Sequence, residues 1–160
     1  MADAELYRLA EKVGIALKDE GLMLATAESC TGGWIGEIIT AVPGSSEWFD
    51  RGFITYSNNS KQEILGVQED TLTKFGAVSE ETVIEMAVGA AQSAKLKVAL
   101  SVSGIAGPGG ALPGKPIGMV CFAWKVKDKT ESKTDYFAGD RSQVRYQAVV
   151  YSLQGLLDRL

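Results

Sequence analysis

Apolar residues recur every three or four positions in several stretches of the chain, and this spacing is typical of helices that bury one face. The clearest stretch is followed by Gly21, a residue type that commonly terminates a helix. Ser79 and Asp140 can each cap the start of another helix, and Gln143 stands at capping-box distance from Asp140. The pattern predicts helices at 5–20, 31–41, 61–65, 68–75 and 79–94, and from 140 to the C-terminus.

Short apolar runs between these helices predict β-strands at 22–27, 53–56, 98–102, 119–126 and 133–137. Helices and strands alternate over much of the chain, which favours a layered α/β domain with a largely parallel sheet. The last two strands are neighbours in sequence and can form a hairpin, so we expect the sheet to be mixed. Because no repeat, low-complexity tract or linker interrupts the pattern, we expect residues 1–160 to form a single domain.

The composition is that of an ordinary globular protein, with 46% hydrophobic and 22% charged residues. The net charge of −4 argues against non-specific binding of nucleic acid. The polar N-terminus is unlike a signal peptide, and no apolar run approaches the length of a membrane span. The two cysteines are too few for a disulfide framework. We therefore expect a cytoplasmic protein with no nucleic-acid or membrane partner.

The chain contains no histidine, which narrows its possible chemistry. Histidine is the commonest metal ligand of proteins and the base of the familiar serine and cysteine triads. A serine nucleophile in this chain would need another base, and lysine is the leading choice. No acidic stretch has the pattern of a metal-binding loop, so we expect neither a metal nor another cofactor.

The stretch Thr26-Ala27-Glu28-Ser29-Cys30-Thr31-Gly32-Gly33 joins a predicted strand to a predicted helix. Ser29 would then lie beside free backbone N–H groups, as a nucleophile requires. The N–H groups of Thr31, Gly32 and Gly33 are the candidate donors to a developing oxyanion. The alternative is that Ser29 or Thr31 simply caps the helix.

Cys30 is a rival nucleophile beside Ser29. Its alternative role is that of a small buried hydrophobic residue. Consecutive residues at the end of a strand point to different sides, so only one of the two side chains is expected to face a site.

Tyr56 and Lys61 follow the predicted strand at 53–56. Lys61 can act as a general base if burial lowers its pKa toward neutrality, and Tyr56 can orient Lys61 or contact a substrate. Otherwise Lys61 is a solvated surface residue and Tyr56 an ordinary strand aromatic. The functional interpretation requires this strand to be a neighbour of the one that ends at Ala27, because ligands collect at the carboxyl ends of strands in α/β sheets.

A glycine-rich loop follows the strand at 98–102, where backbone donors of Ser103, Gly104 and Gly107 can surround a ligand. The segment 109–115 has the spacing of a phosphate-binding P-loop, but Pro116 stands where the magnesium-binding hydroxyl is needed, so we reject that motif. Arg141 and Arg145 lie four positions apart, on one face of the last helix. They can bind phosphate or carboxylate, or remain surface charges.

Taken together, these segments resemble the CinA C-terminal domain family over essentially the whole chain. The resemblance rests on the order and number of motifs: residues 26–33, 44–46, 52–58, Lys61, 76–80, 103–108 and 139–141. The length is similar to that of the stand-alone amidases of the family, which lack the N-terminal molybdopterin-binding-like domain of its longer members.

The resemblance implies a three-layer α/β/α sandwich with a mixed, mostly parallel sheet. It implies hydrolysis of the carboxamide of nicotinamide mononucleotide, giving nicotinate mononucleotide and ammonia, with Ser29 as nucleophile and Lys61 as base. Tyr56 matches the family's site tyrosine, and Arg141 is carried over as a substrate-binding residue. The family also implies no metal requirement and a homo-oligomer, with a dimer as the first expectation.

Two other hypotheses remain open at this point. One is an amidohydrolase that uses Cys30 in place of Ser29. The other is a non-catalytic nucleotide-binding module, suggested by the glycine-rich loop and the arginines of the last helix.

Overall fold

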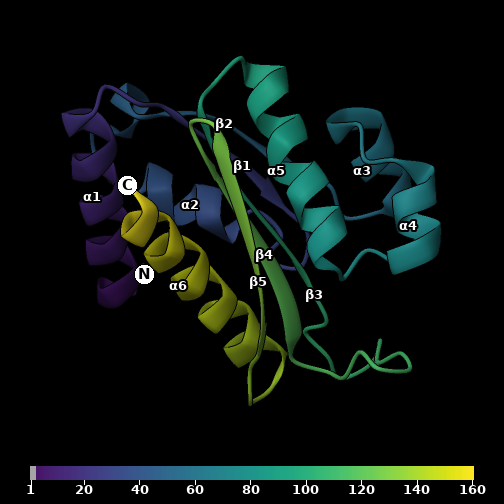
Figure 1. Cartoon of the computed structure of the whole chain (residues 1–160). Helices are drawn as coiled ribbons and strands as arrows, with labels where there is room; N and C mark the ends of the chain where they lie inside the picture. The colour runs from purple at the N-terminus through teal and green to yellow at the C-terminus, as the bar shows by residue number, and fades with distance from the viewer. Residues whose placement is uncertain (1–2) are drawn as a thin grey trace.

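The computed structural model describes residues 3–160 as one five-stranded sheet with helices on both faces (Figure 1). The strands are β1 (Leu24–Glu28), β2 (Phe49–Ile54), β3 (Val98–Gly104), β4 (Met119–Val126) and β5 (Lys129–Tyr136). The helices are α1 (Ala4–Asp19), α2 (Trp34–Thr40), α3 (Asn58–Leu65), α4 (Glu69–Phe75), α5 (Glu80–Ala94) and α6 (Arg141–Arg159), with a 3₁₀ turn, η1, at Ser45–Glu47.

The sheet has the order β2-β1-β3-β4-β5. Strand β1 pairs in parallel with both β2 and β3, whereas β4 is antiparallel to both β3 and β5. Only β4 therefore runs against the other strands, which confirms a mixed, mostly parallel sheet and the expected hairpin.

The helices form a layer on each face of the sheet, and each layer packs on the sheet through its own hydrophobic core. Helices α1, α2 and α6 cover one face over a core that includes Leu24, Val98 and Leu100. Helix α5 covers the other face, where alanines such as Ala25 and Ala99 allow close approach, and α3 and α4 pack on α5. This arrangement confirms the predicted three-layer α/β/α sandwich (Figure 1).

Several predicted boundaries differ from the structure, and the largest shifts are at the starts of four elements. Helix α3 begins at Asn58 and not at 61. The helix expected from residue 31 begins at Trp34, because Gly32 and Gly33 adopt left-handed backbone angles, φ 62° and 100°. Strand β2 begins at Phe49 and not at 53, and β5 begins at Lys129 and not at 133. Both strands lie at the edges of the sheet and expose much of their surface, so their polar residues hid them from a search for apolar runs.

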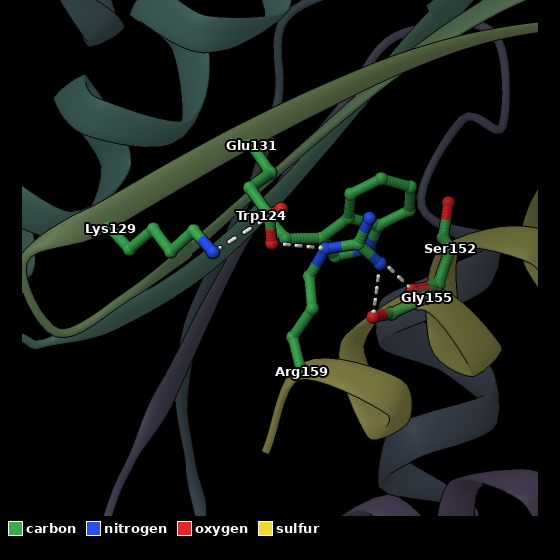
Figure 2. Close-up of polar contacts among 6 residues, drawn as sticks. All are labelled: Trp124, Lys129, Glu131, Ser152, Gly155 and Arg159. Atoms are coloured by element: carbon green, nitrogen blue, oxygen red, sulfur yellow. Dashed lines mark hydrogen bonds and ion pairs between the residues drawn. The ribbon is translucent and has the colours of Figure 1, made fainter.

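The last turns of α6 are anchored on the β4–β5 hairpin (Figure 2). The guanidinium of Arg159 lies 4.0 Å from the centre of the Trp124 ring, and its Nε donates to Glu131 over 3.0 Å. The indole Nε1 of Trp124 donates to the carbonyl of Ser152 over 2.8 Å. A Cβ atom on Gly155 would come within 2.2 Å of the indole, so only glycine fits there. These contacts fix the helix whose opposite end carries Arg141 and Arg145.

Candidate active site

The site lies where the parallel strands end. In the register of the sheet, Glu28 of β1 pairs with Ile54 of β2 on one side and with Val102 of β3 on the other. The predicted strand neighbours are therefore true neighbours, and the segments that follow them meet at one edge of the sheet. Ser29 follows β1 directly, and its N–H donates to the carbonyl of Val102 over 3.0 Å.

Ser29 and Lys61 are in direct contact. Lys61, on α3, directs its Nζ atom to Oγ of Ser29 at 3.0 Å and to the carbonyl oxygen of Thr55 at 2.7 Å. Lys61 is 1% exposed and Ser29 is 8% exposed. No carboxylate among residues 3–160 pairs with Lys61, and burial lowers the pKa of its ammonium group to about 8. About a tenth of Lys61 is therefore neutral at pH 7, far more than for an ordinary lysine.

The backbone around Lys61 explains its burial. Ser57 caps α3 with a reciprocal capping box to Ser60, so the helix begins at once after the strand–turn segment. Farther along, α3 packs on α5 through Gly89, where a Cβ atom would come within 1.9 Å of the carbonyl oxygen of Leu65. The small residue lets α3 approach closely enough for Lys61 to reach Ser29.

Cys30 lies on the face of the sheet that α1, α2 and α6 cover, opposite the face covered by α5. It is 6% exposed and belongs to the core between the sheet and helices α1, α2 and α6. Burial raises the pKa of its thiol to about 12. The thiol is therefore protonated at neutral pH and is packed into the core, which disfavours Cys30 as a nucleophile.

Glu28 was not predicted as part of the site, yet it organises the turn at 29–33. Its buried carboxylate accepts hydrogen bonds from the Thr31 hydroxyl at 2.5 Å and from the N–H groups of Ile35 and Gly36 at 3.0 and 3.1 Å. Neither Ser29 nor Thr31 caps α2 as the alternative interpretation supposed; the N-cap residue is Gly33, and Glu28 supplies the acceptor oxygens. The signal in the sequence was a carboxylate directly after an apolar strand.

The amides of the turn divide into occupied and free donors. The Gly32 N–H, one of the predicted oxyanion donors, donates to the carbonyl of Ser29 at 3.0 Å. The Trp34 N–H donates to the carbonyl of Thr31, and those of Ile35 and Gly36 donate to Glu28, so the first amides of α2 are occupied as well. Within residues 3–160, the N–H groups of Cys30, Thr31 and Gly33 have no acceptor, so they are the donors that an oxyanion can use.

Tyr56 and Arg141 form the rim of the site with the glycine-rich loop. Arg141 donates from Nη1 to the carbonyl of Gly107 at 2.8 Å and from Nη2 to the Tyr56 hydroxyl at 3.1 Å. Tyr56 is 63% exposed. A cavity of about 550 Å³ adjoins this rim, and it is lined by Ala106, Gly107, Pro108, Ile117, Gly139, Asp140, Arg141 and Ser142.

The other predicted residues lie at the end of β3 and on α6. Ser103 is buried at the end of β3. Gly104 packs against β4, where a Cβ atom would meet Val120 at 2.7 Å, so its role in the fold is close packing of the strands. Arg145 donates to the carbonyls of Cys30 and Thr31, each over 3.0 Å, and thus contacts the turn from the α6 side.

The part of the chain that the structure describes, residues 3–160, holds no group of three or more acidic or cysteine side chains placed to bind a metal ion. In the same range, no helix is both long enough and apolar enough to cross a membrane.

A buried serine in contact with a buried lysine at the carboxyl edge of a mostly parallel sheet is an arrangement that suits an α/β hydrolase. Residues 6–160 match the CinA C-terminal domain, and the chain belongs to that family. A relative from Escherichia coli K12, named nicotinamide-nucleotide amidohydrolase PncC, is 51% identical over 98% of this chain and 95% of its own length. A protein of the same name from Pseudomonas putida is 47% identical over 93% of both chains.

Solved structures agree with this assignment. A CinA superfamily protein from Enterobacter cloacae superposes with a TM-score of 0.93 at 42% identity, over 96% of this chain and 91% of that one. A competence/damage-inducible protein from Agrobacterium tumefaciens gives a TM-score of 0.94 at 39% identity, over 99% and 97% of the two chains. The relatives named as amidohydrolases confirm the expectation that the chain is an amide-hydrolysing enzyme.

Proposed function

We propose that this protein hydrolyses the carboxamide of nicotinamide mononucleotide to nicotinate mononucleotide and ammonia, with Ser29 as nucleophile and Lys61 as general base. The observation that carries the proposal is the 3.0 Å contact between Ser29 Oγ and the Nζ atom of a buried lysine. The substrate follows from the relatives named nicotinamide-nucleotide amidohydrolase, at 47–51% identity.

The first half of the reaction forms an acyl-enzyme. Neutral Lys61 takes the proton of the Ser29 hydroxyl while Oγ bonds to the carboxamide carbon, and the carbonyl oxygen becomes an oxyanion. When the C–N bond breaks, Lys61 returns that proton to the nitrogen, which leaves as ammonia. Ser29 is then esterified by the nicotinoyl group.

The second half uses water. Lys61, neutral again, takes a proton from a water molecule whose oxygen bonds to the ester carbon. Collapse of this intermediate breaks the bond to Oγ, and the proton returns to Ser29. The products are free enzyme and the acid, which ionises at neutral pH. Burial of Lys61 serves both halves because only its neutral form can accept a proton.

Backbone donors of the turn at 29–33 support the charge that develops in both halves. The N–H groups of Cys30, Thr31 and Gly33 remain without an acceptor within residues 3–160. A well-placed donor of this kind contributes about 3 kcal/mol to catalysis.

The phosphate of the mononucleotide needs a cation at the mouth of the site. Arg141 is the best candidate because it is exposed, lies at the N-terminus of α6 and adjoins the cavity beside Gly107. Tyr56, which Arg141 contacts, offers an aromatic face and a hydroxyl to the same ligand.

Two further expectations belong to this proposal. The protein acts as a homodimer, as the family resemblance implies. The edge strand β2 and the exposed side chains of Ile54 and Tyr56 offer surface that a second copy can cover; light scattering tests this. It works in the reducing cytoplasm, where the buried thiols of Cys30 and Cys121 stay unpaired.

The test is ammonia release from nicotinamide mononucleotide by the wild-type protein, Ser29→Ala and Cys30→Ala. We expect Ser29→Ala to lose orders of magnitude in kcat while losing only about 1 kcal/mol of stability. Cys30→Ala is the matched control at the adjacent position and should retain turnover. Wild-type protein that binds the mononucleotide tightly but releases no ammonia would be a binding module. Turnover in Ser29→Ala together with a dead Cys30→Ala would refute the nucleophile.

A further inference from the structure

The side chain of Arg145, on α6, donates hydrogen bonds to the turn that carries Ser29. Its acceptors in that turn are backbone carbonyl oxygens. Its Nε donates to the carbonyl of Cys30 and its Nη2 to the carbonyl of Thr31, each over 3.0 Å. These are consecutive carbonyl groups, and one planar guanidinium holds both. The inference drawn from this contact rests on the proposed function.

The surroundings of Arg145 restrict its movement. Its guanidinium lies 5.5 Å from the centre of the Trp34 ring, and a Cβ atom on Gly32 would come within 3.4 Å of Nη2. No acidic side chain among residues 3–160 forms an ion pair with it. The charge of Arg145 is thus directed at the turn, whereas Arg141, one helical turn earlier, points to Gly107 and Tyr56.

The contact with the Cys30 carbonyl fixes the direction of the Thr31 N–H, because both groups belong to one peptide plane. In a planar trans peptide the C=O and the N–H point in opposite directions. The Cys30 carbonyl points toward α6, so the Thr31 N–H points away from α6, toward the face on which Ser29 meets Lys61. That N–H has no acceptor within residues 3–160.

Glu28 restrains the same turn through a second set of hydrogen bonds. Its carboxylate accepts from the Thr31 hydroxyl and from two amides of α2, so the Thr31 side chain is fixed as well as its carbonyl. Arg145 holds the Cys30 carbonyl and Glu28 holds the Thr31 side chain, so rotation of the peptide that carries the Thr31 N–H is resisted at both ends.

We propose that Arg145 is a positioning residue that aims the Thr31 N–H at the oxyanion formed on the substrate carbonyl. It touches neither the substrate nor the reacting atoms. Its contribution lies in preorganisation, because a donor that already points at the developing charge costs no reorganisation during the reaction.

The experiment measures kcat and KM for amide hydrolysis by Arg145→Ala, Arg145→Lys, Arg141→Ala and Arg8→Ala. Arg145→Ala should lose about 10- to 100-fold in kcat with little change in KM, since a misaligned donor weakens only the transition state. Arg145→Lys should be intermediate because an ammonium has no planar fork to span both carbonyls. Arg8→Ala, an exposed residue of α1, is the control for loss of one positive charge.

Rescue separates positioning from mere folding. Millimolar guanidinium added to Arg145→Ala should restore part of kcat, whereas a variant that is only less folded would not recover. If Arg145→Ala does not fold, Arg145→Lys carries the test, with melting temperature measured beside kcat. Wild-type kcat in Arg145→Lys and Arg145→Ala, or a raised KM with unchanged kcat, would overturn the inference; the second result would make Arg145 a phosphate ligand.

The wild type and Ser29→Ala are assayed in the same series. They distinguish failure of the positioning role of Arg145 from failure of the proposed function. Turnover that Ser29→Ala abolishes and Arg145→Ala leaves intact refutes the positioning role alone. A wild-type protein without turnover refutes the proposed function, and the positioning role with it.

Discussion

Lys61 donates to Ser29 over 3.0 Å although 32 positions of sequence separate the two residues. The parallel pairing of β1 with β2 brings their following segments to one edge of the sheet, and α3 then returns Lys61 toward the end of β1. Burial of both side chains makes the contact a close one in a water-poor environment, where a lysine can give up its proton.

Replacing Lys61 distinguishes a base from an anchor for phosphate. We expect Lys61→Arg to be nearly as inactive as Lys61→Ala, because a guanidinium keeps its proton at any working pH. An anchor would behave differently: Lys61→Arg would then keep much of its rate, and Lys61→Ala would mainly raise KM. Measuring kcat and KM for both variants decides, and wild-type kcat in Lys61→Arg would end the Ser/Lys mechanism.

The pH dependence of kcat/KM should report the ionisation of Lys61 in the free enzyme. Burial lowers its pKa to about 8, and the active form is the neutral one. The rate should therefore rise by about tenfold per pH unit below the pKa and level off above it. A profile of kcat/KM from pH 6 to 10 tests this, and a profile that is flat from pH 6 to 8 would contradict it.

Glu28 should matter first for stability. Glu28→Ala leaves the Thr31 hydroxyl and two amides of α2 without their acceptor, which we expect to cost about 2 kcal/mol or more. Glu37→Ala, an exposed acid on the same helix, is the matched control and should change little. Urea denaturation of both variants measures the difference; equal midpoints would show that Glu28 does not hold the turn.

The anchor of α6 should be sensitive to a single methyl group. Gly155→Ala places a Cβ atom 2.2 Å from the Trp124 indole, and the forced repacking should cost about 1–3 kcal/mol. Gly109→Ala, where a Cβ atom meets nothing within 4 Å, provides the comparison. Melting temperatures of the two variants are the measurement, and a Gly155→Ala protein as stable as Gly109→Ala would refute the close packing.

Chelators should leave activity unchanged. The chain has no histidine, and residues 3–160 contain no cluster of acidic or cysteine side chains at ligand spacing. Activity lost in EDTA and restored by an added metal would refute a mechanism in which Ser29 and Lys61 act alone.

The sequence was sufficient to predict the layers and the order of most elements, because the buried strands and amphipathic helices carry strong patterns. It placed Ser29 and Lys61 at strand ends, but only the order of strands could bring those ends together. Edge strands were predicted too short, as at Phe49 and Lys129, since a half-exposed strand has no continuous apolar run.

The contacts of Glu28 and Arg145 could not be predicted from the sequence, and the reason is different. Glu28 accepts from backbone amides of α2, and Arg145 donates to backbone carbonyls of the turn at 29–33. No spacing rule relates a side chain to amides or carbonyls that the fold brings near it. Arg145 also lies 115 positions from Cys30, so its contact depends on how α6 docks on the sheet.

The orientation of Cys30 has a consequence for an organism under oxidative stress. Enzymes that use a thiolate nucleophile are silenced when peroxide converts it to a sulfenic acid. In the proposed mechanism the reacting atom is the Ser29 oxygen, and the adjacent Cys30 is a protonated thiol in the core beneath α1, α2 and α6. The proposed hydrolysis should therefore survive peroxide and iodoacetamide at doses that inactivate a cysteine amidase, so this reaction can continue while thiol enzymes are inhibited.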